Sequence, residues 1–168
     1  DKDENMLTEL NRELLLFKNF RKINIEFVCS DLNSMDISNF LLKNKVQFYL
    51  NFAAIKHVRS EENIQSIKYM FKTNSINFVP KKIINLKKIF SISTDKTVNP
   101  SSILGISKYL MELNLSKFKN KNIFVSSVRF ANVAFSNGSI LKYVVDRLIQ
   151  KKEFGAPENI KRFFITHS

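Results

Sequence analysis

The segment Ser93-Thr94-Asp95-Lys96 brings a hydroxyl, a carboxylate and an amine together in one short stretch of the chain. Such a set can relay a proton, with Asp95 as the acid and Lys96 as the base where the surroundings lower the pKa of the lysine. The same residues also fit a polar loop that leads to a helix N-terminus, with Ser101 or Ser102 as the cap. Residue types alone leave both interpretations open.

A second lysine follows at helical spacing. Leu104 comes eight residues after Lys96, and Lys108 lies four residues further on, one turn along the same helix face. From there Lys108 could reach a ribose hydroxyl of a dinucleotide bound at the edge of a sheet. Gly105 lies in the first turn of this helix, where glycine costs about 1 kcal/mol relative to alanine, so its presence indicates a close approach of backbone.

These residues must be positioned by strands and helices that alternate along the chain. The hydrophobic period predicts helices over 3–18, 34–43, 60–78, 101–118 and 139–152, and strands over 23–28, 46–52, 88–93 and 123–130. Helices of this length between strands imply right-handed crossovers. The predicted fold class is therefore α/β, a Rossmann-like parallel sheet with helices on both faces. Ligands of such sheets bind at the carboxyl ends of the strands, which precede Asp31, Ala53-Ala54, Ser93–Lys96 and Asn132.

The composition describes a globular protein. The 168 residues are 44% hydrophobic, which is typical of a folded domain rather than a disordered chain. No apolar run approaches the roughly 20 residues that a membrane-spanning helix needs. Cys29 is the one cysteine and cannot form an internal disulfide, so the sequence predicts a reducing, cytoplasmic location. No cluster of Cys and His residues indicates a metal site.

The net charge of +12 suggests nucleic acid as a partner, because a basic surface is the electrostatic footprint of such proteins. Only six of the 27 cationic residues are arginine, however, and arginine is the side chain that base and phosphate recognition favours. The lysines are scattered along the chain rather than grouped. A solvated basic surface without a nucleic-acid partner is the preferred interpretation.

Five segments, taken in order, resemble one family. They are Asn51–Glu61, Thr73-Asn74, the stretch from Ser93 to Lys108, Arg129–Ser139 and Arg162–Thr166. Together they look like the polysaccharide biosynthesis (CapD-like) proteins, a bacterial branch of nucleotide-sugar 4,6-dehydratases among the extended short-chain dehydrogenases/reductases. Five ordered matches are far more specific than any single one.

The resemblance implies a lyase that acts on UDP-N-acetylglucosamine or a close relative, with tightly bound NAD or NADP. In this family a hydride leaves carbon 4, water is eliminated across carbons 5 and 6, and the hydride returns to carbon 6. The product is a UDP-4-keto-6-deoxy sugar for surface glycans. By resemblance Lys96 is the base at carbon 5, Asp95 protonates the leaving hydroxyl, Thr94 binds the hydroxyl at carbon 4, and Lys108 holds the nicotinamide ribose.

The remaining contacts are also carried over by resemblance. Those implied for the adenosine half and the dinucleotide backbone of the cofactor are Asp1, Asp31, Leu32, Ala53 and Ala54. Asn74 is expected behind the nicotinamide, with a buried structural asparagine as the alternative. For the substrate, Asn132 is the candidate for the UDP diphosphate and Lys56 is a possible contact.

Two departures from the family pattern matter. Most extended members have a tyrosine four residues before the lysine, and here that residue is Leu104, which carries no proton. A 4-epimerase of the same family, the alternative function, normally keeps this tyrosine. The Gly-x-Gly-x-x-Gly phosphate loop is also missing, since the first glycine is Gly105.

We therefore expect residues 1–168 to be a partial NAD(P)-binding domain, truncated at both ends, whose substrate-binding part starts at about residue 130. The resemblance also implies a homo-oligomer, and membrane anchoring only through segments outside this sequence.

Overall fold

The computed structural model describes residues 1–79, 85–119, 122–136, 138–155 and 161. It divides into two compact units, residues 1–128 and residues 129–168. The first unit contains most of the sheet and the residues predicted to be catalytic. Among the described residues, no helix combines the length and apolar character needed to cross a membrane.

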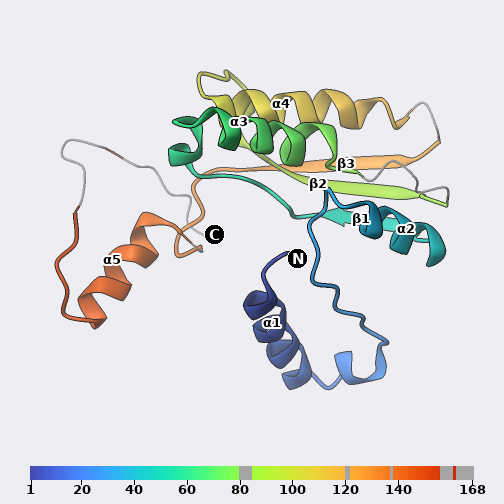
Figure 1. The fold of residues 1–168 in the computed structure, drawn as a ribbon, viewed down its shortest axis with the longest axis horizontal. Coiled ribbons are helices and arrows are strands. Elements are labelled where there is room, and N and C mark those ends of the chain that lie inside the picture. The colour runs from blue at the N-terminus through green and yellow to red at the C-terminus, as the bar shows by residue number, and fades with distance from the viewer. Residues whose placement is uncertain (80–84, 120–121, 137, 156–160, 162–168) are drawn as a thin grey trace, which may run out of the picture. The chain divides into compact units, whose positions relative to one another are not determined.

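The sheet has three strands in the described part of the chain, β1 (Phe48–Asn51), β2 (Lys88–Thr94) and β3 (Phe124–Phe130). Their order is β1-β2-β3, so β2 is central, and the sheet is parallel (Figure 1). In the β1–β2 register Tyr49 lies opposite Ile89. Parallel strands require crossover connections, and helices supply them here.

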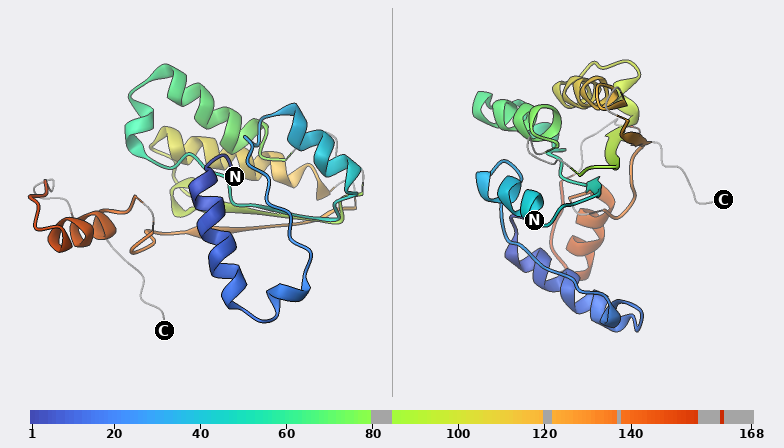
Figure 2. Two further views of the ribbon diagram at one scale, coloured as in Figure 1. Left: turned by 60° about the horizontal axis from the view of Figure 1, so that its bottom comes forward. Right: turned by 90° about the vertical axis from the view of Figure 1, so that its right-hand side faces the viewer.

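The helices are α1 (Glu4–Leu16), α2 (Met35–Lys43), α3 (Ile64–Phe71), α4 (Ile103–Ser116) and α5 (Ile140–Ile149). Within the first unit, α3 and α4 cover one face of the sheet and α1 lies on the opposite side (Figures 1 and 2). The predicted α/β class, a Rossmann-like parallel sheet with helices on both faces, is confirmed.

Polar side chains fix where the helices begin. At each of the five N-termini, the residue before the helix accepts a hydrogen bond from a backbone N–H of the first turn; these residues are Asp3, Ser34, Asn63, Ser102 and Ser139. Of the two serines predicted as alternatives before α4, Ser102 is the cap, and its Oγ accepts from the N–H of Gly105 at 3.1 Å.

The hydrophobic core lies between the sheet and the helices that cover it. Its buried members are Tyr49, Phe78, Val79, Leu86, Ile89, Met111 and Leu115. Side chains alternate along β2, so Ile89, Ser91 and Ser93 are all buried, while the residues between them are more exposed. Ser91 donates to the sulfur of Met111 at 3.0 Å, so the small serine lets α4 pack close to the strand.

The structure differs from the sequence prediction at two elements, the strand over 23–28 and the helix over 60–78. Residues 23–28 are not a strand: in the described part of the chain, hydrogen bonds to a neighbouring segment occur only at the end of this stretch. There the N–H of Asp1 donates to Val28 O at 3.3 Å and the N–H of Ser30 donates to Asp1 O at 2.8 Å. Asp1 thus bonds to the residues before and after Cys29, which is how two neighbouring parallel strands pair. A strand needs a partner for its backbone groups, and the sequence pattern does not reveal whether one is available.

The helix predicted over 60–78 is also interrupted. A short 3-10 turn, Val58–Glu61, precedes the helix, Asn63 then caps α3, and α3 continues as a π-helical turn over Lys72–Ile76. The wider turn buries Thr73, Asn74 and Ser75. Wide turns of this kind are frequent at functional sites.

Candidate functional site

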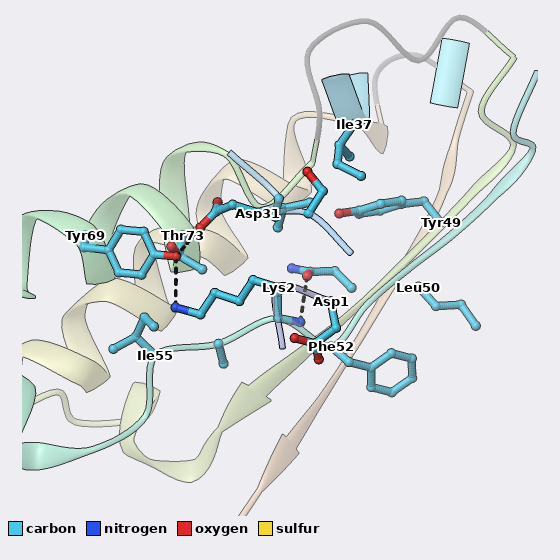
Figure 3. A pocket seen from close by; sticks show the side chains of 15 residues that line it. Asp1, Lys2, Asp31, Ile37, Tyr49, Leu50, Phe52, Ile55, Tyr69 and Thr73 are labelled. Atoms are coloured by element: carbon cyan, nitrogen blue, oxygen red, sulfur yellow. Dashed lines mark hydrogen bonds between the residues drawn. The ribbon is translucent and has the colours of Figure 1, made fainter. Parts of the chain in front are cut away.

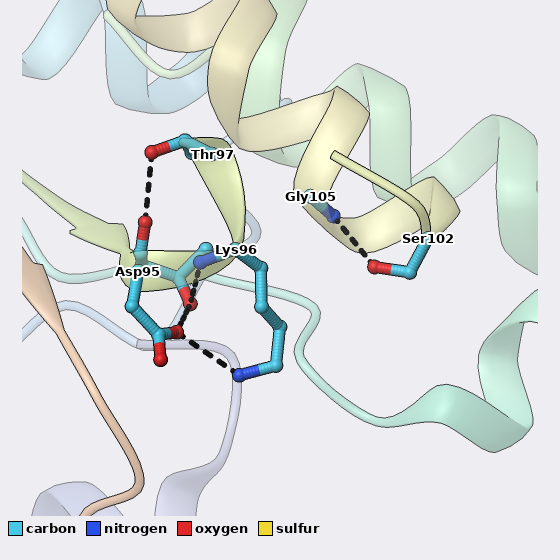
Figure 4. Close-up of polar contacts among 6 residues, drawn as sticks. Asp95, Lys96, Thr97, Ser102 and Gly105 are labelled. Atoms are coloured by element: carbon cyan, nitrogen blue, oxygen red, sulfur yellow. Dashed lines mark hydrogen bonds and ion pairs between the residues drawn. The ribbon is translucent and has the colours of Figure 1, made fainter. Parts of the chain in front are cut away.

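The predicted proton-relay residues follow β2 directly. Thr94 ends the strand, and Asp95–Thr97 forms a 3-10 turn. Asp95 Oδ1 accepts a hydrogen bond from Thr94 Oγ1 at 3.0 Å and forms an ion pair with Lys96 Nζ at 3.1 Å. In Figure 4 the carboxylate and the ammonium point toward each other. The side chains of Lys96 and Asp95 are 44% and 49% exposed, so the pair is open to a ligand.

Partial burial acts to raise the pKa of Asp95, but hydrogen bonds from Lys96 and Thr94 and the charge of Lys96 outweigh it. The pKa of Asp95 therefore lies below its usual value. At neutral pH Asp95 is therefore a carboxylate, and it forms an ion pair with Lys96.

Lys108 lies in α4 and extends toward β2. Its Nζ donates to the carbonyl oxygen of Ile92 at 2.9 Å and lies 3.9 Å from the sulfur of Met111. Only 3% of the residue is exposed. Burial disfavours the charged amine and lowers the pKa of Lys108 to about 8.

The first turn of α4 packs on the turn Asp95–Thr97 that follows β2. A Cβ added to Gly105 would lie 2.7 Å from the carbonyl oxygen of Lys96, which is closer than side-chain atoms approach a backbone oxygen. Figure 4 shows Gly105 beside Lys96. This confirms the close backbone approach that the glycine indicated, and the approached backbone is that of Lys96.

Leu104, at the position of the family's usual tyrosine, is 8% exposed. Its N–H donates to Glu61 Oε1 at 3.0 Å, and the N–H of Ile103 donates to Glu61 Oε2 at 3.3 Å. A carboxylate from the turn before α3 therefore binds the positive end of α4. Glu61 was part of the family-like segment, but its contact with α4 could not be predicted from spacing.

A pocket of about 430 Å³ lies at the carboxyl end of β1. Its lining includes all five residues expected at the adenosine half and dinucleotide backbone of the cofactor: Asp1, Asp31, Leu32, Ala53 and Ala54. Figure 3 shows Lys2, Asp31 and Tyr69 grouped at one side of this pocket. Residues from three distant parts of the chain thus meet where a parallel sheet binds its ligands.

Asp31 is held by its neighbours in this pocket. Oδ1 accepts from the backbone N–H and the side-chain amide of Asn33, at 2.7 and 2.8 Å, and Oδ2 accepts from the Tyr69 hydroxyl at 2.5 Å. Partial burial opposes ionisation, but these bonds prevail and the pKa of Asp31 is below its usual value.

Sequence reasoning missed Tyr69. The available signal was its place four residues before Thr73, on the same face of a helix. Lys2 Nζ lies 3.5 Å from the Tyr69 hydroxyl and 5.0 Å from the centre of the ring, so it adds a cation to the same group.

Asn74 is fully buried, and its side-chain amide forms hydrogen bonds to other residues of the protein. Its Oδ1 accepts from the N–H of Ile55 at 2.9 Å, and its Nδ2 donates to Ile55 O and to Ser107 Oγ, both at 3.0 Å. These bonds join the segment after β1 to α4. The structure favours the alternative of a buried structural asparagine, and Asn74 is not among the residues that line the pocket.

The two residues expected to contact substrate lie in different units. Lys56 is exposed between β1 and α3 in the first unit, and Asn132 is exposed after β3 in the second. The segment Arg162–Thr166, expected to close the sugar site, lies outside the described residues.

Comparison with known proteins gives a family match over residues 1–168, to the family described as polysaccharide biosynthesis protein. The chain is 35% identical over 89 residues to the capsular polysaccharide biosynthesis protein CapD of Staphylococcus aureus, a match over 48% of this chain and 14% of CapD. It is 28% identical over 157 residues to a UDP-glucose 4-epimerase of Rickettsia bellii, a match over 84% of this chain and 43% of the epimerase. The chain thus spans less than half the length of these relatives.

The fold is similar to that of a metagenomic short-chain oxidoreductase solved in complex with NADP. The TM-score is 0.64 at 17% identity, over 88% of this chain and 76% of the other. At this level of identity the likeness concerns the fold. Together with the family match, it shows that the chain belongs to the polysaccharide biosynthesis protein family and has the fold of a short-chain dehydrogenase/reductase.

Proposed function

We propose that this chain carries the catalytic residues of a nucleotide-sugar 4,6-dehydratase that acts on UDP-N-acetylglucosamine or a similar UDP sugar in surface polysaccharide biosynthesis. The observation that carries the proposal is the Asp95–Lys96 ion pair beside Thr94 at the carboxyl end of β2. An acid and a base in contact are what elimination of water requires, because one group removes a proton and the other donates one.

The protons balance when Lys96 acts as an amine and Asp95 as a carboxylate. As carbon 4 is oxidised, Asp95 takes the proton of the carbon 4 hydroxyl through Thr94 and becomes the acid. The Lys96 amine then removes the proton from carbon 5, and Asp95 donates its proton to the hydroxyl that leaves carbon 6 as water. The proton on Lys96 returns to carbon 5 when the hydride returns to carbon 6, which restores both side chains. Oxidation at carbon 4 makes the carbon 5 proton acidic, since it then lies beside a ketone.

The pocket at the end of β1 fits the adenosine half of a dinucleotide. Asp1 and Asp31 offer carboxylate acceptors for hydroxyl or amino groups, and Ala53 and Ala54 leave room for a close approach. NAD or NADP, when bound, supplies the hydride acceptor that this chemistry needs. The Lys108 ammonium could donate a hydrogen bond to a ribose hydroxyl, provided that it exchanges Ile92 O for the ligand. The NADP named for the similar oxidoreductase supports a nicotinamide cofactor of either kind.

A 4-epimerase is the second candidate, because relatives that match 84% of this chain carry that name. An epimerase needs no acid–base pair for elimination. Both enzymes need a group that takes the proton from the hydroxyl during oxidation, and the buried Leu104 can do so in neither. The Asp95–Lys96 pair, which only elimination requires, therefore favours the dehydratase.

Mass spectrometry of the full-length protein incubated with UDP-N-acetylglucosamine tests the proposal. We expect a product lighter than the substrate by one water, and an isomer of unchanged mass would instead indicate an epimerase. Asp95→Asn should slow product formation by ~100-fold or more, as expected when a general acid is lost. Glu62→Gln, a change at an exposed carboxylate, is the matched control and should have no effect. No change in mass with this or related UDP sugars would refute the dehydratase assignment.

A further inference from the structure

The buried hydroxyls on either side of the catalytic turn share one acceptor. Ser93 Oγ donates to Glu112 Oε1 at 2.5 Å, and Thr97 Oγ1 donates to the same oxygen at 3.3 Å. Ser93 is 3% exposed and Thr97 is 2% exposed. One carboxylate of α4 therefore binds the residues immediately before and after Thr94-Asp95-Lys96.

The burial of these groups makes the contact specific. A buried hydroxyl without an acceptor costs about 1–3 kcal/mol, so the hydrogen bond from Ser93 holds the Glu112 carboxylate in place as much as the carboxylate holds Ser93. Hydrogen bonds to a charged acceptor are also stronger than those between neutral groups. The single proton of Thr97 Oγ1 is shared between Glu112 Oε1 and Thr94 O, which lies 2.8 Å away, and the bond to Thr94 O closes the turn on itself.

Glu112 is on the same helix as the two other groups that touch this region. Gly105 packs against Lys96 O, and Lys108 donates to Ile92 O. Lys108 and Glu112 are four residues apart and lie on one face of α4. The helix thus contacts the end of β2 and the following turn through Gly105, Lys108 and Glu112. Of these three, Glu112 is the residue that binds on both sides of the segment 94–96.

We propose that Glu112 is a positioning residue that keeps the Asp95–Lys96 pair in register with Lys108. This inference rests on the proposed function for its catalytic consequence. The two bonds of Glu112 to Ser93 and Thr97 touch neither Asp95 nor Lys96, so they act by fixing the backbone on which the pair is carried. A shift of about 1 Å in such a group can lower turnover ~100-fold.

The test compares Glu112→Gln with Glu112→Ala in the full-length protein, with Glu62→Ala as the control carboxylate. The amide oxygen of glutamine can accept both hydroxyl bonds, so Glu112→Gln should keep turnover within about threefold of the parent protein. Glu112→Ala should lower kcat by ~10- to 100-fold while KM for the UDP sugar changes little, because the variant disturbs the reacting groups rather than substrate binding. Equal turnover in Glu112→Ala and the parent would overturn the proposal, and so would an equal loss in both variants.

A second readout does not depend on activity. Hydrogen–deuterium exchange of the backbone amides of residues 94–97 should be faster in Glu112→Ala than in the parent, with exchange in α3 unchanged. Unchanged exchange in 94–97 would overturn the positioning role. Because this measurement needs no substrate, failure of the positioning role is distinguishable from failure of the dehydratase proposal.

If Glu112→Ala does not fold, Ser93→Ala removes the shorter bond of Glu112 from the other side and leaves the bond between Thr97 and Thr94 in place. This variant should reproduce both the loss of kcat and the faster exchange in residues 94–97. A folded Ser93→Ala variant with normal kcat and normal exchange would refute the role of Glu112.

Discussion

The turn after β2 and the pocket after β1 are held in different ways. Around the turn, the groups that make the supporting contacts are almost fully buried, with Ser93, Thr97 and Lys108 each at most 3% exposed. Around the pocket, Asp1 and Lys2 are exposed, and Asp31 and Tyr69 are partly buried. The contrast indicates that the residues we propose as acid and base are fixed by the packing of α4, whereas the charged side chains of the pocket lie nearer to solvent.

This difference fits the two tasks that we propose. An acid–base pair gains from a rigid backbone, because proton transfer depends on small changes in distance. A cofactor pocket can complete its contacts when the ligand binds. Three changes test the contrast, two on the buried side and one on the pocket side.

Lys108→Met should have the largest effect, seen in how stability depends on pH. The pKa of Lys108 is about 8 in the folded chain, below its ordinary 10.5, so the unfolded chain binds more protons between these values. The parent protein therefore gains stability as pH rises through this window, by ~2 kcal/mol from about pH 8 to 9.5, and Lys108→Met lacks this gain. Urea unfolding of both proteins measures the difference.

The comparison must stay below pH 10. Burial raises the pKa of Tyr49 above its usual 10.0, and ionisation of this tyrosine in the unfolded chain then acts against stability. A difference in the free energy of unfolding between parent and variant that stays constant over the window would contradict the buried environment of Lys108.

Gly105→Ala should have the next largest effect. The added Cβ would lie 2.7 Å from Lys96 O, so either α4 or the turn Asp95–Thr97 must move, at about 1–2 kcal/mol of folding stability. Thermal unfolding measures this loss. Gly155→Ala is the matched control, because nothing lies within 4 Å of a Cβ there. If the two variants were equally stable, α4 would not pack against Lys96 as described.

Tyr69→Phe should have the smallest effect. It removes the hydrogen bond to Asp31 and leaves the ring, which is expected to cost about 1 kcal/mol in the free energy of unfolding. Tyr109→Phe, at an exposed position on α4, serves as the control and should cost nothing. A loss larger than that of Gly105→Ala would show that the pocket is held as firmly as the turn.

The sequence predicted the helices well because each combines a 3.6-residue apolar period with a polar cap, as Ser102 does for α4. It also predicted the close approach at Gly105, because a glycine in the first turn of a helix weakens the helix unless a neighbouring backbone leaves no room for a side chain. The segment 23–28 shows the limit of periodicity. Its apolar run satisfies the strand pattern, but pairing depends on a partner strand that periodicity does not reveal.

Side-chain partners from distant segments could not be predicted. In the sequence, Glu112 and Tyr69 look like any other residues of a helix. Only the fold brings Glu112 to Ser93 and Tyr69 to Asp31. Asn74 was noticed through the family resemblance, yet its bonds to Ile55 and Ser107 follow from the π-helical turn, which no local pattern signalled.

The most direct test of the proposed elimination follows a deuterium label placed on carbon 4 of UDP-N-acetylglucosamine through one reaction of the full-length protein. If Asp95 and Lys96 catalyse elimination as proposed, NMR of the product should show the label at carbon 6 of a UDP-4-keto-6-deoxy sugar. Label found on carbon 4 of the sugar with inverted configuration at that carbon, and no loss of water, would contradict the dehydratase and identify the enzyme as an epimerase.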